Sequence, residues 1–250
     1  MRGCLRYHGP MQWTMQLASP LKTVPMNSTL VELFFTLETP IAVFQNRKGV
    51  WAEALRFLCA KANVVGKQTP QAAASAITTY CHGKHGLLYD SAGGGRSRYN
   101  VRSKGGEFAL ENYLLRTRQT ANCYDQAAAL QALCGSVGIE LSWIFLDPYG
   151  YINKTNLLGY GDCNNPFFAS DGSPKVVDVN DRQRTPFGNH AFCEREGRIL
   201  DACAGPHIGT ETRGEYVEAS IDTTTKLYAP DWRPGTVADM VLCPGVQGVL

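Results

Sequence analysis

The stretch Asn122–Gly138, NCYDQAAALQALCGSVG, decides how the rest of the sequence is interpreted. Apolar residues recur in it at helical spacing, at positions 127, 130, 134 and 137. Asn122 is a good N-cap, Asp125 falls in the first turn, and Gly138 can end the helix. The pattern therefore predicts a helix with Cys123 in its first turn.

Helical patterns precede this stretch and strand-like patterns follow it. Helices are predicted at Trp51–Ala62, from Thr69-Pro70 to about Tyr80, and at Glu107–Leu115. Strands are predicted at 139–146, 176–179, 189–193, 198–203 and 216–221. This order favours an α+β domain in which an antiparallel sheet packs on the earlier helices.

Two other segments have less regular patterns. The chain begins with an irregular, proline-containing segment, and short strands are expected at 30–37 and 41–44. Residues 91–106 contain five glycines and four Arg or Lys residues with few apolar anchors. We expect this segment to be a mobile surface loop that could form the rim of a site.

Cys123 is a candidate nucleophile because of its place in the predicted helix. A thiol attacks a carbonyl carbon as the thiolate, and the unpaired N–H groups and peptide dipoles at a helix start favour negative charge. The same N–H groups can stabilise the oxyanion that forms when a thiolate adds to an amide. A cysteine on an apolar helix stripe is more often a packing residue, so the assignment needs a base.

His190 is the histidine that is followed by a plausible hairpin, which turns at Glu196-Gly197 and returns to Asp201. A loop of two or four residues pairs Arg195 with Arg198 and places His190 and Asp201 on one face, as diagonal neighbours about 7–8 Å apart. A three-residue loop would separate them. On one face, the imidazole could take the thiol proton and the carboxylate could orient the ring. The alternative is an ordinary histidine and a surface acid.

In combination, these residues resemble the transglutaminase-like core of the papain-related thiol enzymes. That core has a Cys that opens a helix, then a strand, and later a His and an Asp on neighbouring strands. The matching segments lie within about residues 50–205, and they are Asn122–Ala127, Gly138-Ile139, Asn189–Phe192 and Ile199–Asp201. Two departures are the short hairpin and Phe192, where Trp is common.

The resemblance implies a papain-like fold over residues 1–250 as a single catalytic domain, with extensions at both ends of the core. It implies a catalytic triad of Cys123, His190 and Asp201, with no metal or organic cofactor. By analogy with papain-like enzymes, Gln119 is a candidate second oxyanion donor, and Trp51 is a more distant one.

The chemistry that the resemblance implies is acyl transfer from a protein or peptide amide through a Cys123 thioester. Glutamine deamidation or crosslinking is the first expectation, and a cysteine peptidase of the same fold is the alternative. A non-catalytic binding scaffold is a third possibility. A compact catalytic domain would also suit a toxin or effector that is delivered into another cell.

Charge and composition limit the kinds of partner that the sequence predicts. The 24 Lys and Arg residues against 22 Asp and Glu leave a formal charge of +2, without the basic stripe that nucleic-acid binding requires. The first thirty residues lack the apolar core of a signal peptide, and no run approaches a membrane span. We expect a cytoplasmic protein, or one exported without a classical signal peptide, and the oligomeric state stays open.

The nine cysteines form an odd set without the spacing of a disulfide framework, which favours reduced thiols. Two sets could be considered as zinc ligands, Cys81 with His82 and His85, and Cys193 with Cys203. Neither set supplies two ligand pairs at finger-like spacing, so no metal site is expected.

Overall fold

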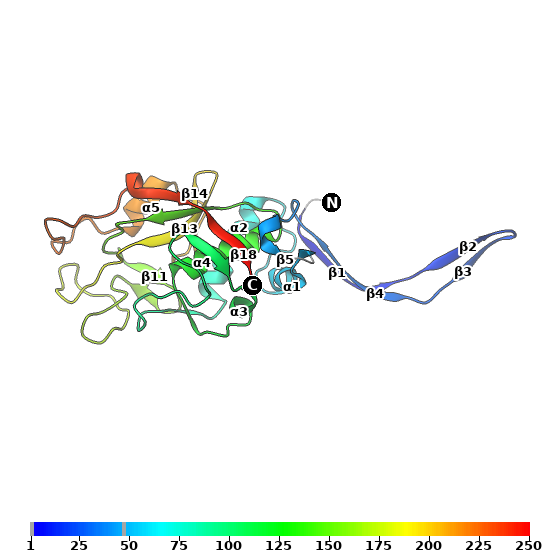
Figure 1. Cartoon of the computed structure of the whole chain (residues 1–250), viewed down its shortest axis with the longest axis horizontal. Helices are drawn as coiled ribbons and strands as arrows, with labels where there is room; N and C mark the ends of the chain where they lie inside the picture. Colours follow the sequence, from blue (N-terminus) through cyan, green and yellow to red (C-terminus); the bar gives the residue numbers. More distant parts are fainter. Residues whose placement is uncertain (1–2, 47–48) are drawn as a thin grey trace.

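Helix α4 (Cys123–Gly135) is the central element of the computed structural model, which describes residues 3–46 and 49–250 (Figure 1). All of its 13 residues except Tyr124 are buried. A helix that is buried all round needs neighbours on every side. These neighbours include α2 (Pro70–Gly83), α3 (Leu110–Leu114), β8 (Gly105–Phe108), β13 (His190–Arg195) and β18 (Gly245–Val249).

A five-stranded antiparallel sheet packs against α4. Its order is β16-β14-β13-β10-β17, and the strands besides β13 are β10 (Ser142–Leu146), β14 (Arg198–Asp201), β16 (His207–Ile208) and β17 (Met240–Cys243). The Cys193 thiol of β13 donates a hydrogen bond to the carbonyl oxygen of Ala127 in α4, at 3.3 Å. The predicted α+β class, with helices packed on an antiparallel sheet, is confirmed.

The remaining elements of the body are short. The helices are α1 (Ala52–Ala60), α5 (Arg213–Ser220), and the 3-10 helices η1 (Ala42–Phe44) and η2 (Val237–Asp239). The strands are β5 (Gln45–Asn46), β6 (Gly49–Val50), β7 (Leu88–Tyr89), β9 (Thr120–Ala121), β11 (Thr155–Leu157), β12 (Gly161–Cys163) and β15 (Ala204–Gly205). Among the described residues, none of the helices has the length and apolar character needed to cross a bilayer.

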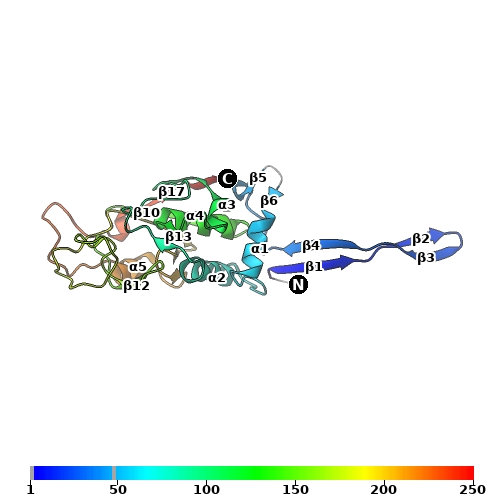
Figure 2. The same cartoon turned by 90° about the horizontal axis from the view of Figure 1, so that it is seen from below.

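A long two-stranded arm extends away from the body (Figures 1 and 2). Near the body β1 (Leu5–Met11) pairs with β4 (Thr29–Phe35), and farther out β2 (Thr14–Ala18) pairs with β3 (Leu21–Pro25), both antiparallel. The expected irregular start is therefore wrong. Apolar residues alternate with a period of two from Tyr7 to Leu17, which is the pattern of a strand with one apolar face.

Three predicted strands are also wrong. Residues 41–44 contain η1, residues 176–179 lie in no strand, and most of 216–221 belongs to α5. The cause at α5 is a capping box, in which Thr212 caps the backbone N–H of Glu215 and the Glu215 carboxylate caps that of Thr212. This reciprocal pair starts a helix despite the strand-like composition that follows. The predicted helices at α1, α2, α3 and α4 are confirmed.

The glycine-rich segment 91–106 is largely irregular and partly exposed, and it is tied to the first turn of α4. The Asp125 carboxylate accepts hydrogen bonds from the Ser97 hydroxyl (2.6 Å) and from the backbone N–H groups of Arg98 (2.8 Å) and Tyr99 (3.1 Å). The Asn122 amide donates to the carbonyl oxygen of Gly95 at 2.8 Å. The side chains that hold the segment, Asn122 and Asp125, belong to the start of α4. The composition of the segment itself therefore could not predict these contacts.

A buried arginine, Arg184, holds together the long irregular connections that follow β10. Its side chain is 0% exposed and forms an ion pair with Asp222 at 2.6 Å. Its other hydrogen bonds go to the backbone carbonyl oxygens of Ile152 (2.6 Å), Asn164 (3.1 Å) and Val179 (2.9 Å). One guanidinium therefore satisfies acceptors in four separate segments.

The substitution Arg184→Met should lower the free energy of unfolding by about 3–5 kcal/mol, because it leaves the buried Asp222 carboxylate without its partner. Urea denaturation followed by circular dichroism measures this loss. The matched control is Arg233→Met, which removes an ion pair to Asp239 whose arginine is 59% exposed. That change should cost less than about 1 kcal/mol. Equal losses in the two variants would contradict the role given to Arg184.

Candidate active site

Cys123, His190 and Asp201 come from three elements that meet at the N-terminal end of α4. Cys123 is the first residue of α4, His190 is the first of β13, and Asp201 is the last of β14. The hairpin turn holds two residues, Glu196 and Gly197, whose φ angles of 51° and 75° suit a tight hairpin turn. It pairs Arg195 with Arg198, as the two-residue alternative predicted. His190 and Asp201 therefore lie on one face.

The His190 imidazole is bonded to Asp201 and lies beside Cys123. Its Nε2 is 2.8 Å from Asp201 Oδ2, and each of these side chains is 1% exposed. Nδ1 is therefore the ring nitrogen that is not bonded to Asp201, and the Cys123 side chain lies close enough to the ring to help raise its pKa. Burial lowers the pKa of His190, but the charges and hydrogen bonds of Asp201 and Cys123 outweigh burial and raise it.

Asp201 is held as a charged hydrogen-bond acceptor. Oδ1 accepts from the backbone N–H of Cys203 at 2.7 Å, and Oδ2 accepts from the Tyr216 hydroxyl at 3.0 Å. Burial raises the pKa of Asp201, yet the charge and hydrogen bond of His190, together with the Cys203 bond, bring it below its ordinary value. Tyr216 was missed from sequence because its segment was assigned to a strand, and the Thr212–Glu215 capping box is the signal that could have placed it on a helix.

Aromatic rings fix the orientation of the imidazole. The Phe187 ring is stacked on His190 with centroids 5.6 Å apart and planes 5° apart, and Tyr149 lies 5.1 Å away at 60°. The Tyr124 hydroxyl donates a hydrogen bond to the Asn189 side chain. This bond joins the neighbour of Cys123 to the neighbour of His190, so the thiol and the ring keep their relative positions.

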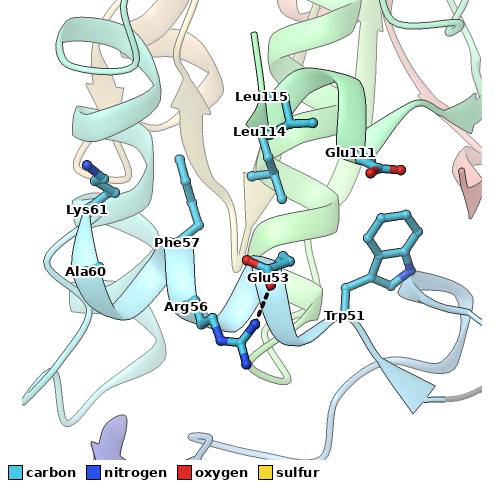
Figure 3. Close-up of a pocket in the computed structure, with 9 residues that line it drawn as sticks. All are labelled: Trp51, Glu53, Arg56, Phe57, Ala60, Lys61, Glu111, Leu114 and Leu115. Carbon is cyan, nitrogen blue, oxygen red and sulfur yellow. Dashed lines mark hydrogen bonds and ion pairs between the residues drawn. The ribbon is translucent and has the colours of Figure 1, made fainter. Parts of the chain in front are cut away.

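Neither predicted oxyanion donor has a hydrogen bond to Cys123 in the described part of the chain. Gln119 is exposed, and its amide donates to the carbonyl oxygen of Arg116 at 3.3 Å. Trp51 lines a cavity of about 430 Å³ between α1 and α3, together with Phe57, Leu114 and Leu115 (Figure 3). Cys123, His190 and Asp201 do not line that cavity.

All nine cysteines lie in the described part of the chain and are free thiols. Burial raises the pKa of eight of them, which keeps these thiols protonated near neutral pH. They are Cys4, Cys59, Cys81, Cys134, Cys163, Cys193, Cys203 and Cys243.

Neither comparison with known proteins identifies a relative: no protein-family model matches this chain, and no curated protein matches it. Within residues 3–46 and 49–250, no group of three or more His, Cys, Asp or Glu side chains is placed to hold a metal ion. The interpretation of the site therefore depends on the geometry of its own residues.

The substitution Asp201→Asn should lower the pKa of His190, which is raised above its ordinary value of about 6.5 in the native protein, because it removes the carboxylate charge while the burial of the ring remains. In the native protein the raised pKa means that the protonated ring stabilises the fold below about pH 6.5, and this contribution is lost as the pH rises through the folded-state pKa. NMR titration of the histidine Cε1–H signals measures both values.

His85 is the internal control for this titration. It is buried, and burial lowers its pKa without any contribution from Asp201. Its signal should titrate at the same pH in both proteins. An unchanged His190 pKa in the variant would contradict the coupling of the two side chains.

Proposed function

We propose that this chain is a thiol acyltransferase of the transglutaminase-like, papain-related class, with Cys123 as nucleophile, His190 as base and acid, and Asp201 as the orienting carboxylate. The observation that carries the proposal is the His190 ring, which is bonded to Asp201 through Nε2 and lies close enough to Cys123 for that side chain to help raise its pKa. A central helix that begins at the cysteine and packs on an antiparallel sheet supports a papain-like core.

In the first half-reaction His190 Nδ1 takes the proton from Cys123 Sγ, and the thiolate adds to the carbon of a carboxamide. The raised pKa of His190 supports a ring that holds this proton. The oxyanion is stabilised by the N–H groups of Cys123 and Tyr124, which have no acceptor within the helix because they lie in its first turn. The C–N bond then breaks, ammonia leaves with the proton from the ring, and a thioester remains.

In the second half-reaction the neutral ring takes a proton from the incoming nucleophile. Water gives a carboxylate, so that glutamine becomes glutamate, and a primary amine gives a substituted amide. In both cases the C–S bond breaks and His190 returns the proton to Cys123 Sγ. Asp201 keeps the ring in the tautomer that serves both steps, because it accepts the hydrogen from Nε2.

A glutamine side chain suits this site better than a backbone peptide bond. Cys123 is 5% exposed and His190 is 1% exposed, so access to the sulfur is narrow. A carboxamide at the end of a flexible side chain needs a small opening, whereas a main chain needs a groove on both sides of the thiol. The protein substrate would therefore present glutamine, and a peptidase or a non-catalytic scaffold would be distinguished by the assay below.

The substitution Cys123→Ala should abolish ammonia release from a glutamine-rich unfolded protein, with a rate loss of at least about 10³-fold. His190→Ala should cause a loss of the same order, because a nucleophile and its base act as one unit. Incorporation of a fluorescent primary amine reports crosslinking, and mass spectrometry of the substrate reports chain cleavage. Cleavage without ammonia release would favour the peptidase.

Alkylation with iodoacetamide, followed by peptide mapping, tests the thiol without a substrate. Cys123 should be modified first in the native protein and should lose this advantage in His190→Ala. The control Cys59→Ser removes a half-buried thiol of α1 and should leave ammonia release and Cys123 labelling unchanged. A Cys123 that is no more reactive than the other eight thiols would overturn the enzyme assignment.

A further inference from the structure

The outer half of the arm is a ribbon whose two faces differ: Met15, Leu17 and Val24 share one face, the apolar face, and the other mixes polar residues with Ala18, Leu21 and Pro25. The β2–β3 register pairs Met15 with Val24 and Leu17 with Lys22 on one face, and Gln16 with Thr23 on the other. Beyond this ladder the N–H of Met26 donates to the carbonyl oxygen of Trp13 at 2.9 Å, which extends the pairing toward the body. Trp13 is 49% exposed and Met15 is 44% exposed, so the apolar face is open to solvent.

The same face continues to the base of the arm. In the β1–β4 register Tyr7 is opposite Leu33 and Leu5 is opposite Phe35, and Leu33 and Phe35 are both exposed. The residues of the first strand share the odd-numbered face, which runs from Leu5 to Leu17. Glu32 lies on the opposite face, where it pairs with Arg6 and with Arg56 of α1. The body therefore holds one face of the base and leaves the apolar face free.

An isolated two-stranded ribbon is marginally stable in water, and an apolar surface of this length marks an interaction site. Lys22 is the single Asp, Glu, Lys or Arg residue between positions 9 and 31. Nucleic acid and other strongly charged partners need opposite charges on the surface that binds them. A surface with so few charged residues does not provide these charges. The occupant must instead offer a long apolar surface of its own.

The base of the arm offers a complement to its tip. A cavity of about 340 Å³ lies there, and its lining residues are Gly3, Phe35, Thr36, Leu37, Glu38, Gln68 and Pro70. Phe35 belongs to the apolar face, and Glu38 is exposed. At the tip, Leu17 and Lys22 share that same face. The arm therefore has an apolar residue and a cation at one end, and a cavity and a carboxylate at the other.

We propose that the apolar face of the arm docks on the arm of a second copy of this chain, with the two arms antiparallel about a two-fold axis. Each tip then reaches the base of the other arm, where Leu17 faces the cavity and Lys22 faces Glu38. A two-fold interface makes every such contact twice. The ribbon face and the cavity lining together supply nearly the roughly 20–30 residues per copy that a stable interface contains.

Light scattering coupled to gel filtration tests the proposal on the full chain, which should have twice the monomer mass at about 50 µM, within the range of a micromolar Kd. Met15→Glu places a charge on the apolar face and should give a monomer. Its matched control, Gln16→Glu, places the same charge one residue away on the opposite face and should remain a dimer. Unchanged near-ultraviolet circular dichroism should show that the body of each variant stays folded.

Charge reversal tests the antiparallel geometry. Lys22→Glu and Glu38→Lys should each weaken the dimer about tenfold, because like charges then face each other, and the double variant should recover wild-type affinity. A wild-type monomer at about 50 µM would overturn the proposal. So would equal dissociation of Met15→Glu and Gln16→Glu, or reversals that the double variant fails to rescue. A monomer that binds neutral phosphatidylcholine vesicles would assign the face to lipid instead.

Discussion

The start of helix α4 is fixed by two residues that bond to each other, and the candidate site depends on that point. Asn122 Oδ1 accepts from the Asp125 N–H and Asp125 Oδ2 accepts from the Asn122 N–H, both at 3.1 Å. The helix cannot begin elsewhere without losing both bonds. Burial raises the pKa of Asp125, while its bonds to Asn122, Ser97, Arg98 and Tyr99 favour the charged form. The cap that positions Cys123 thus also anchors the glycine-rich segment.

The register of the β13–β14 hairpin positions His190, the candidate base. The two-residue turn aligns β13 with β14, and pairing of β14 with β16 places Asp201 opposite His207. Helix α5 then closes over the carboxylate and supplies the Tyr216 hydroxyl. His190, with Phe187 and Tyr149 against its ring, has little freedom to rotate. Both oxygens of the buried Asp201 carboxylate accept hydrogen bonds, which favours the charged form in this dry environment.

Apolar side chains are buried in the body of the protein and exposed on its arm. The body buries them around α4, where residues such as Leu130, Leu133 and Trp143 are 0% exposed. The arm leaves them in water on one face of a ribbon, and its base is held by the ion pair between Glu32 and Arg56. The first arrangement builds a rigid site, and the second presents a surface whose burial needs another molecule.

Local signals in the sequence determined the helix at Cys123, its N-cap, the helices before it and the position of the hairpin turn, whereas the structure decided that this turn holds two residues. Each of these features depends on residues within a few positions of one another, so it can be predicted from the spacing of those residues. The alternation from Tyr7 to Leu17 was equally readable and was overlooked, as was the capping box at Thr212. Only the tertiary structure decided the Tyr216 bond to Asp201, the Phe187 stack on His190 and the tie between Asp125 and Ser97. Those contacts join segments whose distance in space is set by the packing of the whole chain, and no spacing in the sequence encodes it.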